Sequence, residues 1–263
     1  MRLLDWISTR AVSLGREVSD AGSAAVYMRQ LLRGNRIPVE TFAESTSDPG
    51  TPQPPVLLLH GYLATRGSLH LLERRLTERG HMVLTYRIGP LNVGGIRQSA
   101  GLIARKVESL VTQTPVKKVN IVGHSMGGLV GLYFVKCLGG RDRVNKLVLL
   151  GSPLGGTWSA VLGLVTAPLG RASVELLPSS PVLRELRERP MPVSVDVVTV
   201  AGDRDFFAPD GSSRLDGARH VTVPASHSGL LVDPGVAAAI DAILRQPPPE
   251  APAAQTPAGA AAP

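Results

Sequence analysis

The sequence contains a single cysteine, Cys137, in 263 residues, so no disulfide can form within the chain. Nothing in the sequence therefore requires an oxidising compartment. Aromatic residues make up only 4% of the chain, which leaves few rings on which the bases of a single-stranded nucleic acid could stack. The 28 basic and 21 acidic residues are scattered rather than clustered, so we predict no nucleic-acid partner.

Long apolar runs are also missing. Asp5 and Arg10 interrupt the first ten residues, whereas a signal peptide needs an unbroken apolar stretch. We therefore predict no cleaved signal peptide and a cytoplasmic location. Residues 152–170 carry no charge, but glycines and prolines punctuate them and leave no run long enough for a transmembrane helix.

The composition, 43% hydrophobic and 19% charged, predicts one globular domain over residues 54–245. Short runs rich in leucine and β-branched residues alternate there with longer amphipathic runs, which is typical of an α/β domain with a mostly parallel central sheet. We expect strands at Val56–His60, Met82–Arg87, Val119–Gly123, Lys146–Leu150, Val195–Ala201 and His220–Val223, and helices near Ser68–Arg79, Ile96–Thr112, Gly127–Leu138 and Val236–Arg245.

The two ends of the chain differ from this domain. Residues 246–263 are mostly proline and alanine, which predicts a disordered tail. Residues 1–45 show no strand pattern but carry one helical apolar stripe, which we expect to pack on the domain. Dimerisation and membrane docking are the alternatives, because six arginines outnumber three acidic residues in residues 1–36. The stripe consists of Leu4, Ile7, Ala11, Leu14, Val18, Ala21, Ala25, Met28 and Leu32.

One motif carries chemistry. The predicted strand that ends at Gly123 runs directly into His-Ser-Met-Gly, with Ser125 at its centre and Gly127 at its end, and then into an apolar helix. At such a strand-to-helix turn the serine hydroxyl projects from the sheet edge, while side chains at the two glycine positions would collide with neighbouring backbone. Ser125 is therefore a candidate nucleophile, and an ordinary serine in a tight turn is the alternative.

A serine hydroxyl needs a general base, and the base needs an orienting carboxylate. His227 lies in a loop just before the last predicted helix and is the candidate base, whereas His220 begins a strand and is expected at the surface. Asp203 and Asp205 compete as the acid, because both follow a buried strand. The spacing from Gly202 favours Asp205 and leaves Asp203 as a turn former.

Two backbone N–H groups, those of Tyr62 and Met126, are candidates for an oxyanion hole, since Tyr62 follows the first strand and Met126 follows the serine. His60 ends a buried strand, so we interpret it as a residue that holds the loop, and we expect His124 to line the turn. No metal-ligand spacing and no phosphate-binding loop are present, so we predict neither a metal nor a cofactor.

Over Pro54–Arg245 the sequence resembles the α/β-hydrolases, and among them the small bacterial lipases and esterases. The resemblance rests on Ile121–Gly128 (IVGHSMGG), Gly151–Thr157 (GSPLGGT) and Ser213–Arg219 (SRLDGAR) with the His227 segment that follows. It implies the α/β-hydrolase fold, with Asp205 and His227 as catalytic acid and base. Two departures, an additional N-terminal segment and no signal peptide, argue against secretion and digestion of bulk fat.

Residues 152–190 form a longer insertion than those small lipases have, and we expect it to act as a cap or lid. Trp158, Leu162 and Val165 in this insertion are candidates for the walls of an acyl pocket, and the stretch Leu176–Leu186 resembles the cap helix region of lipase-like proteins.

The predicted function is a serine carboxylic-ester hydrolase that acts on an apolar acyl ester, either a small molecule or a lipid. An acyltransferase or thioesterase with the same three residues is one alternative, because the residues alone do not choose the acyl acceptor. A non-catalytic protein that binds a membrane or a partner is the other, with residues 1–36 and 152–170 as its points of peripheral membrane contact.

Overall fold

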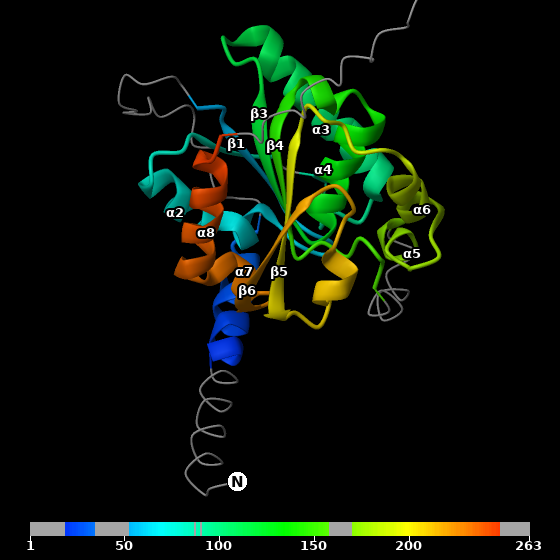
Figure 1. Ribbon diagram of the computed structural model, residues 1–263. Helices are drawn as coiled ribbons and strands as arrows, with labels where there is room; N and C mark the ends of the chain where they lie inside the picture. Colours follow the sequence, from blue (N-terminus) through cyan, green and yellow to red (C-terminus); the bar gives the residue numbers. More distant parts are fainter. Residues whose placement is uncertain (1–18, 35–52, 87, 90, 158–169, 248–263) are drawn as a thin grey trace, which may run out of the picture.

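The computed structural model describes residues 19–34, 53–86, 88–89, 91–157 and 170–247, and at its centre lies a single sheet (Figure 1). The six strands are ordered β2-β1-β3-β4-β5-β6, and every neighbouring pair is parallel. The predicted α/β class and parallel sheet are therefore confirmed. The strands are β1 (Val56–Leu59), β2 (Val83–Thr85), β3 (Val119–His124), β4 (Val144–Leu150), β5 (Asp196–Arg204) and β6 (Arg219–Ser226).

Both faces of the sheet are covered by helices. Along β1, Leu57 and Leu59 join one apolar cluster and Val56 and Leu58 join the other, because successive side chains of a strand point to opposite faces. The first cluster includes α3 (Ile96–Gln113) and α4 (Met126–Cys137), and the second includes α2 (His70–Glu78), α7 (Gly229–Val232) and α8 (Pro234–Arg245). Burial on both faces explains why the strands are apolar throughout.

All six predicted strands and all four predicted helices are present, with shifted ends. β5 and β6 both run three residues beyond their predicted ends, as far as Arg204 and Ser226, which pair with each other. This last stretch of β6 contains Pro224, which the edge position of the strand tolerates. The apolar pattern of the sequence did not predict these three-residue extensions, because pairing between the two strands, rather than burial of side chains, stabilises them.

The carboxyl ends of parallel strands lie at one edge of a sheet, so the loops that follow β1, β3, β5 and β6 gather there. These loops carry the residues predicted to form a site. Three short 3₁₀ helices, η1 (Arg66–Leu69), η2 (Gly140–Asp142) and η4 (Asp210–Ser213), and two further α-helices, α5 (Ala172–Glu175) and α6 (Pro181–Glu188), follow or lie between these elements.

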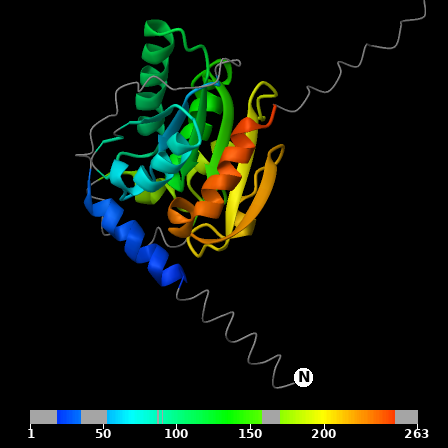
Figure 2. The same ribbon diagram turned by 90° about the vertical axis from the view of Figure 1, so that its left-hand side faces the viewer.

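A separate helix, residues 19–32, precedes the sheet and docks on the same edge (Figures 1 and 2). Asp20 receives two hydrogen bonds from Arg204, at 2.7 and 3.1 Å, the carbonyl of Leu31 accepts one from Thr65 at 3.0 Å, and Tyr27 packs against the second apolar cluster. The apolar stripe is not used, since Met28 and Leu32 are 52% and 80% exposed. The expectation that the stripe packs on the domain is wrong for this part of residues 1–45; residues 1–18 and 35–45 lie outside the described residues.

Candidate active site

The turn between β3 and α4 holds Ser125 in a backbone conformation that L-residues rarely adopt, with φ 54° and ψ −126°. Its two flanking glycines are needed for close approach. A Cβ added at Gly123 would come within 2.5 Å of the Gly127 backbone, and one added at Gly127 would come within 2.4 Å of the Leu59 carbonyl oxygen. The turn therefore presses against β1, and it leaves the Ser125 side chain partly exposed at the sheet edge.

The loops after β5 and β6 bring Asp205 and His227 together. Asp205 Oδ2 lies 2.7 Å from His227 Nδ1, and the aspartate side chain is fully buried. Its other oxygen, Oδ1, accepts hydrogen bonds from the backbone N–H groups of Phe207 and Ala208, at 2.9 and 2.8 Å. Asp203 is instead exposed and pairs with Arg204, so the two competing aspartates have different partners.

His124 connects this pair to the serine turn. Its ring centroid lies 4.5 Å from that of His227, and its Nε2 donates a hydrogen bond to the His227 carbonyl oxygen at 3.1 Å. Within the described residues, no hydrogen bond joins the Ser125 hydroxyl to His227. Hydrogen bonds between a nucleophile and its base are often long before substrate binds, so this geometry is compatible with a catalytic pair.

The loop after β1 lies directly against the serine. A Cβ added at Gly61 would come within 2.9 Å of Ser125 Cβ, which places the following residue, Tyr62, at the edge of the turn. Met126 is the first residue of α4, where backbone N–H groups have no partner within the helix. The two segments that carry the predicted oxyanion donors are thus neighbours.

Asn92 is a residue of this site that the sequence analysis missed. It is buried, has φ 48°, and donates a hydrogen bond from Nδ2 to the His60 carbonyl oxygen at 3.0 Å. Its own Oδ1 accepts a hydrogen bond from Ser99 at 2.9 Å. Asn92 therefore holds the end of β1 from a loop that contains no motif, and only the fold brings the two segments together.

Two buried histidines surround the turn. Burial lowers the pKa of His60 to about 4. The hydrogen bond between the His60 ring and the Gly61 carbonyl oxygen partly offsets this effect, and the nearby positive charge of Arg66 lowers the pKa by a smaller amount. Burial and the neighbouring His227 also hold the pKa of His124 well below its usual range. Both rings are therefore neutral in the folded protein at physiological pH.

These shifts predict that the protein loses stability on mild acidification. An unfolded imidazole has a pKa near 6.5, so below that pH the unfolded state binds protons that His60 in the folded state does not accept. Stability is fully present above about pH 6.5 and falls as the pH drops toward about 4. Between about pH 7.5 and 5, His60 alone should lower the free energy of unfolding by about 2 kcal/mol, measured by urea unfolding.

The matched variant is His60→Gln, because glutamine does not titrate. Its free energy of unfolding should fall less steeply over the same pH range than that of the native protein. An equal slope in the two proteins would show that His60 does not carry the effect.

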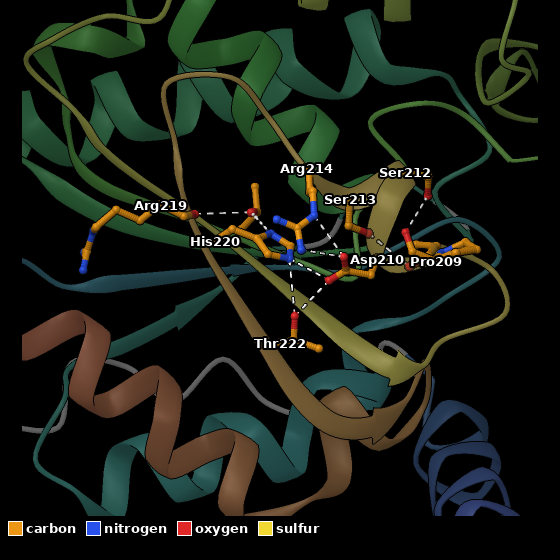
Figure 3. Close-up of polar contacts among 10 residues, drawn as sticks. Pro209, Asp210, Ser212, Ser213, Arg214, Arg219, His220 and Thr222 are labelled. Carbon is orange, nitrogen blue, oxygen red and sulfur yellow. Dashed lines mark hydrogen bonds and ion pairs between the residues drawn. The ribbon is translucent and has the colours of Figure 1, made fainter.

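A second carboxylate–imidazole pair joins Asp210, in the loop between β5 and β6, to His220 at the start of β6 (Figure 3). Asp210 Oδ1 is 2.7 Å from His220 Nε2, and Thr199 lies 2.6 Å from His220 Nδ1. Hydrogen bonds from His220, Arg214 and Thr222 hold the pKa of Asp210 well below its usual range. The expectation of a surface histidine is wrong, because the His220 side chain is only 14% exposed and fastens the loop that begins at Asp205.

The predicted acyl-pocket residues Trp158, Leu162 and Val165 lie outside the described residues. The described part of the 152–190 insertion includes α6, which packs beside α4 and the start of α3. Glu185 pairs with Arg97 at 2.8 Å, and Lys136 Nζ donates hydrogen bonds to the carbonyl oxygens of Leu186 and Arg189. The cap helix region thus rests on the helices behind the serine turn.

Neither a metal cluster nor a membrane-spanning helix occurs in the described ranges. No group of three or more histidine, cysteine, aspartate or glutamate side chains in these ranges could hold a metal ion. The helices of the same ranges are too short or too polar to cross a bilayer.

A parallel sheet with a strained serine after the central strand β3, and with a carboxylate and an imidazole that follow the last two strands, β5 and β6, is the arrangement of the α/β-hydrolase fold. A family model described as "alpha/beta hydrolase fold" matches residues 54–176. The chain has the α/β-hydrolase fold, as the resemblance of its sequence implied.

Solved structures of lipases and esterases share this fold at low sequence identity. The mature lipase BlEst2 of Bacillus licheniformis is 16% identical, with a TM-score of 0.64 over 79% of this chain and 95% of that one. An esterase of Exiguobacterium antarcticum is 17% identical, with a TM-score of 0.58 over 73% and 92%. Aspergillus fumigatus lipase B is 16% identical, with a TM-score of 0.61 over 75% of this chain and 53% of that one.

Proposed function

We propose that the protein is a serine hydrolase of carboxylic esters with an apolar acyl group. The observation that carries the proposal is the buried Asp205–His227 pair at the sheet edge where Ser125 projects from its strained turn. Apolar side chains support the choice of substrate. Phe207 is half-exposed with its ring 5.2 Å from that of His227, and Phe206 and Leu63 are also exposed on loops of this edge.

In this mechanism Ser125 Oγ attacks the ester carbonyl carbon while His227 takes the hydroxyl proton. The N–H groups of Tyr62 and Met126 stabilise the negative oxygen of the tetrahedral intermediate. His227 then gives the proton to the departing alcohol, which leaves an acyl-enzyme. A water molecule, deprotonated by His227, releases the acid and restores Ser125. Asp205 holds the imidazole with Nδ1 protonated, so that Nε2 is free to accept the proton.

The proposal is tested with a fluorophosphonate, which reacts with activated serines, and with p-nitrophenyl esters from acetyl to palmitoyl. We expect one phosphonate adduct per chain, mapped to the peptide that contains Ser125, and hydrolysis that increases as the acyl chain lengthens beyond acetyl. If the rate of ester hydrolysis falls in proportion to the fraction of Ser125 that is labelled, the activity depends on that serine.

No adduct at Ser125 and no hydrolysis of any ester would overturn the proposal. An adduct without hydrolysis would redirect it to acyl transfer or thioester cleavage, which use the same acyl-enzyme. Added short alcohols and acyl thioesters distinguish those two reactions by their products.

A further inference from the structure

The helix of residues 19–32 presents an apolar stripe to solvent. It contacts the domain through a different face. On that face Tyr27 packs against the second apolar cluster, which includes α2 and α8, and Gln30 is buried. A helix that packs against one protein core normally buries its apolar stripe and exposes its polar face. Here the arrangement is reversed, so the stripe is available to a second surface. In the described residues the stripe consists of Ala21, Ala25, Met28 and Leu32.

The charge beside the stripe is basic. Arg29 on this helix and Arg33 in the turn directly after it are exposed, and Asp20, the one acidic residue of residues 19–34, is bonded to Arg204. An apolar face flanked by arginine is the pattern of helices that lie in the interface of an anionic membrane. A surface of anionic headgroups complements both features at once.

The helix also lies next to the candidate active site (Figures 1 and 2). Its start is bonded to Arg204, one residue before Asp205, and the N–H of Gly67, beyond the Tyr62 loop, donates to the Gly34 carbonyl oxygen at 3.0 Å. Two exposed apolar side chains lie close to these contacts in the sequence: Phe206 follows Arg204 by two residues, and Leu63 precedes Gly67 by four. The helix therefore bridges two loops of the edge at which an ester would bind.

We propose that the exposed stripe of this helix docks on an anionic lipid bilayer. Met28 and Leu32 enter the interface and Arg29 and Arg33 contact phosphate groups, which brings the sheet edge with Ser125 to the membrane surface. The docking follows from exposure and charge, so it does not depend on the proposed ester chemistry. A second copy of the chain is the competing occupant, and the experiment below separates the two.

The experiment measures flotation of the full chain with phosphatidylglycerol–phosphatidylcholine vesicles, in a Ser125→Ala background that keeps the lipids intact. Native helix sequence should bind, and Met28→Glu/Leu32→Glu should lower the partition coefficient about tenfold or more. Vesicles of phosphatidylcholine alone should also bind more weakly, because the two arginines lose their anionic partners. Val193→Glu is the matched control. Val193 is 90% exposed but precedes β5, at the opposite edge of the sheet, so this variant should bind as the native sequence does.

Equal binding by Met28→Glu/Leu32→Glu and the native sequence, or no binding by either, would overturn the proposal. Light scattering tests the competing occupant directly. A dimer that becomes a monomer in Met28→Glu/Leu32→Glu, without vesicle binding, would assign the stripe to a second copy. Thermal unfolding should be the same in Met28→Glu/Leu32→Glu and Val193→Glu as in the Ser125→Ala background, since Met28, Leu32 and Val193 are all exposed.

Discussion

Ser125→Ala should lower kcat/KM for a p-nitrophenyl ester by about 10⁴-fold or more and leave the fold intact. The hydroxyl is the only group of the protein that forms a bond with the acyl carbon in the proposed mechanism, so no neighbouring side chain replaces it. Alanine keeps the Cβ that already lies in the turn, and the strain of φ 54° is unchanged. Ester hydrolysis and the urea midpoint together check the prediction.

Ser152→Ala is the control for Ser125→Ala. Ser152 lies just beyond the end of β4, the strand beside β3, and its buried hydroxyl has no hydrogen-bond partner among the described residues. Removal of this hydroxyl changes a neighbouring loop without touching the proposed chemistry, so kcat should stay within about threefold of native. A similar loss in both variants would mean that the edge of the sheet, rather than the Ser125 hydroxyl, had been disturbed.

The parts of the fold that follow from local pattern were predictable. Strands buried on both faces are continuous apolar runs, and helices between them show a single apolar stripe, so both elements are visible in the sequence. The residues of the candidate site could be named for a related reason. Ser125, Asp205 and His227 each follow a predicted strand, and a parallel sheet brings such positions to one edge.

Contacts between distant segments were not predictable. Asn92 supports the carbonyl of His60 from a loop with no motif, and His220 is fastened to Asp210 across a loop of ten residues. Lys146 lies inside β4 with its ammonium 2.6 Å from Asp196, although a lysine is rarely buried. Each of these polar residues is stabilised by specific polar partners, and no periodicity marks which residues those partners are.

The N-terminal helix illustrates a different limit. Its stripe was evident in the sequence, but amphipathicity reports only that a helix has an apolar face and not which surface that face meets. The docking on the domain depends instead on Asp20 and Tyr27, a polar and an amphipathic residue whose partners lie far along the chain. The same pattern is therefore consistent with burial and with exposure, and only the contacts decide.

Asp205→Asn should lower kcat by about 10⁴-fold near neutral pH, with little change in stability. The two N–H groups of Phe207 and Ala208 both require an acceptor at the Oδ1 position, so the amide oxygen of asparagine takes that place. The amide nitrogen is then directed at His227 Nδ1, where the carboxylate oxygen stood. An amide N–H donates, so His227 must carry its proton on Nε2, and Nε2 can no longer accept the proton of Ser125.

Asp203→Asn is the matched control, because it makes the same chemical change two residues away in the same loop. Asp203 is exposed and pairs only with Arg204 among the described residues, so kcat should stay within about twofold of native. The fluorophosphonate extends the comparison, since Asp205→Asn should also react with it far more slowly while Asp203→Asn reacts at the native rate. A large loss in Asp203→Asn with native activity in Asp205→Asn would assign the acid to the other aspartate and separate the buried Asp205–His227 pair from catalysis.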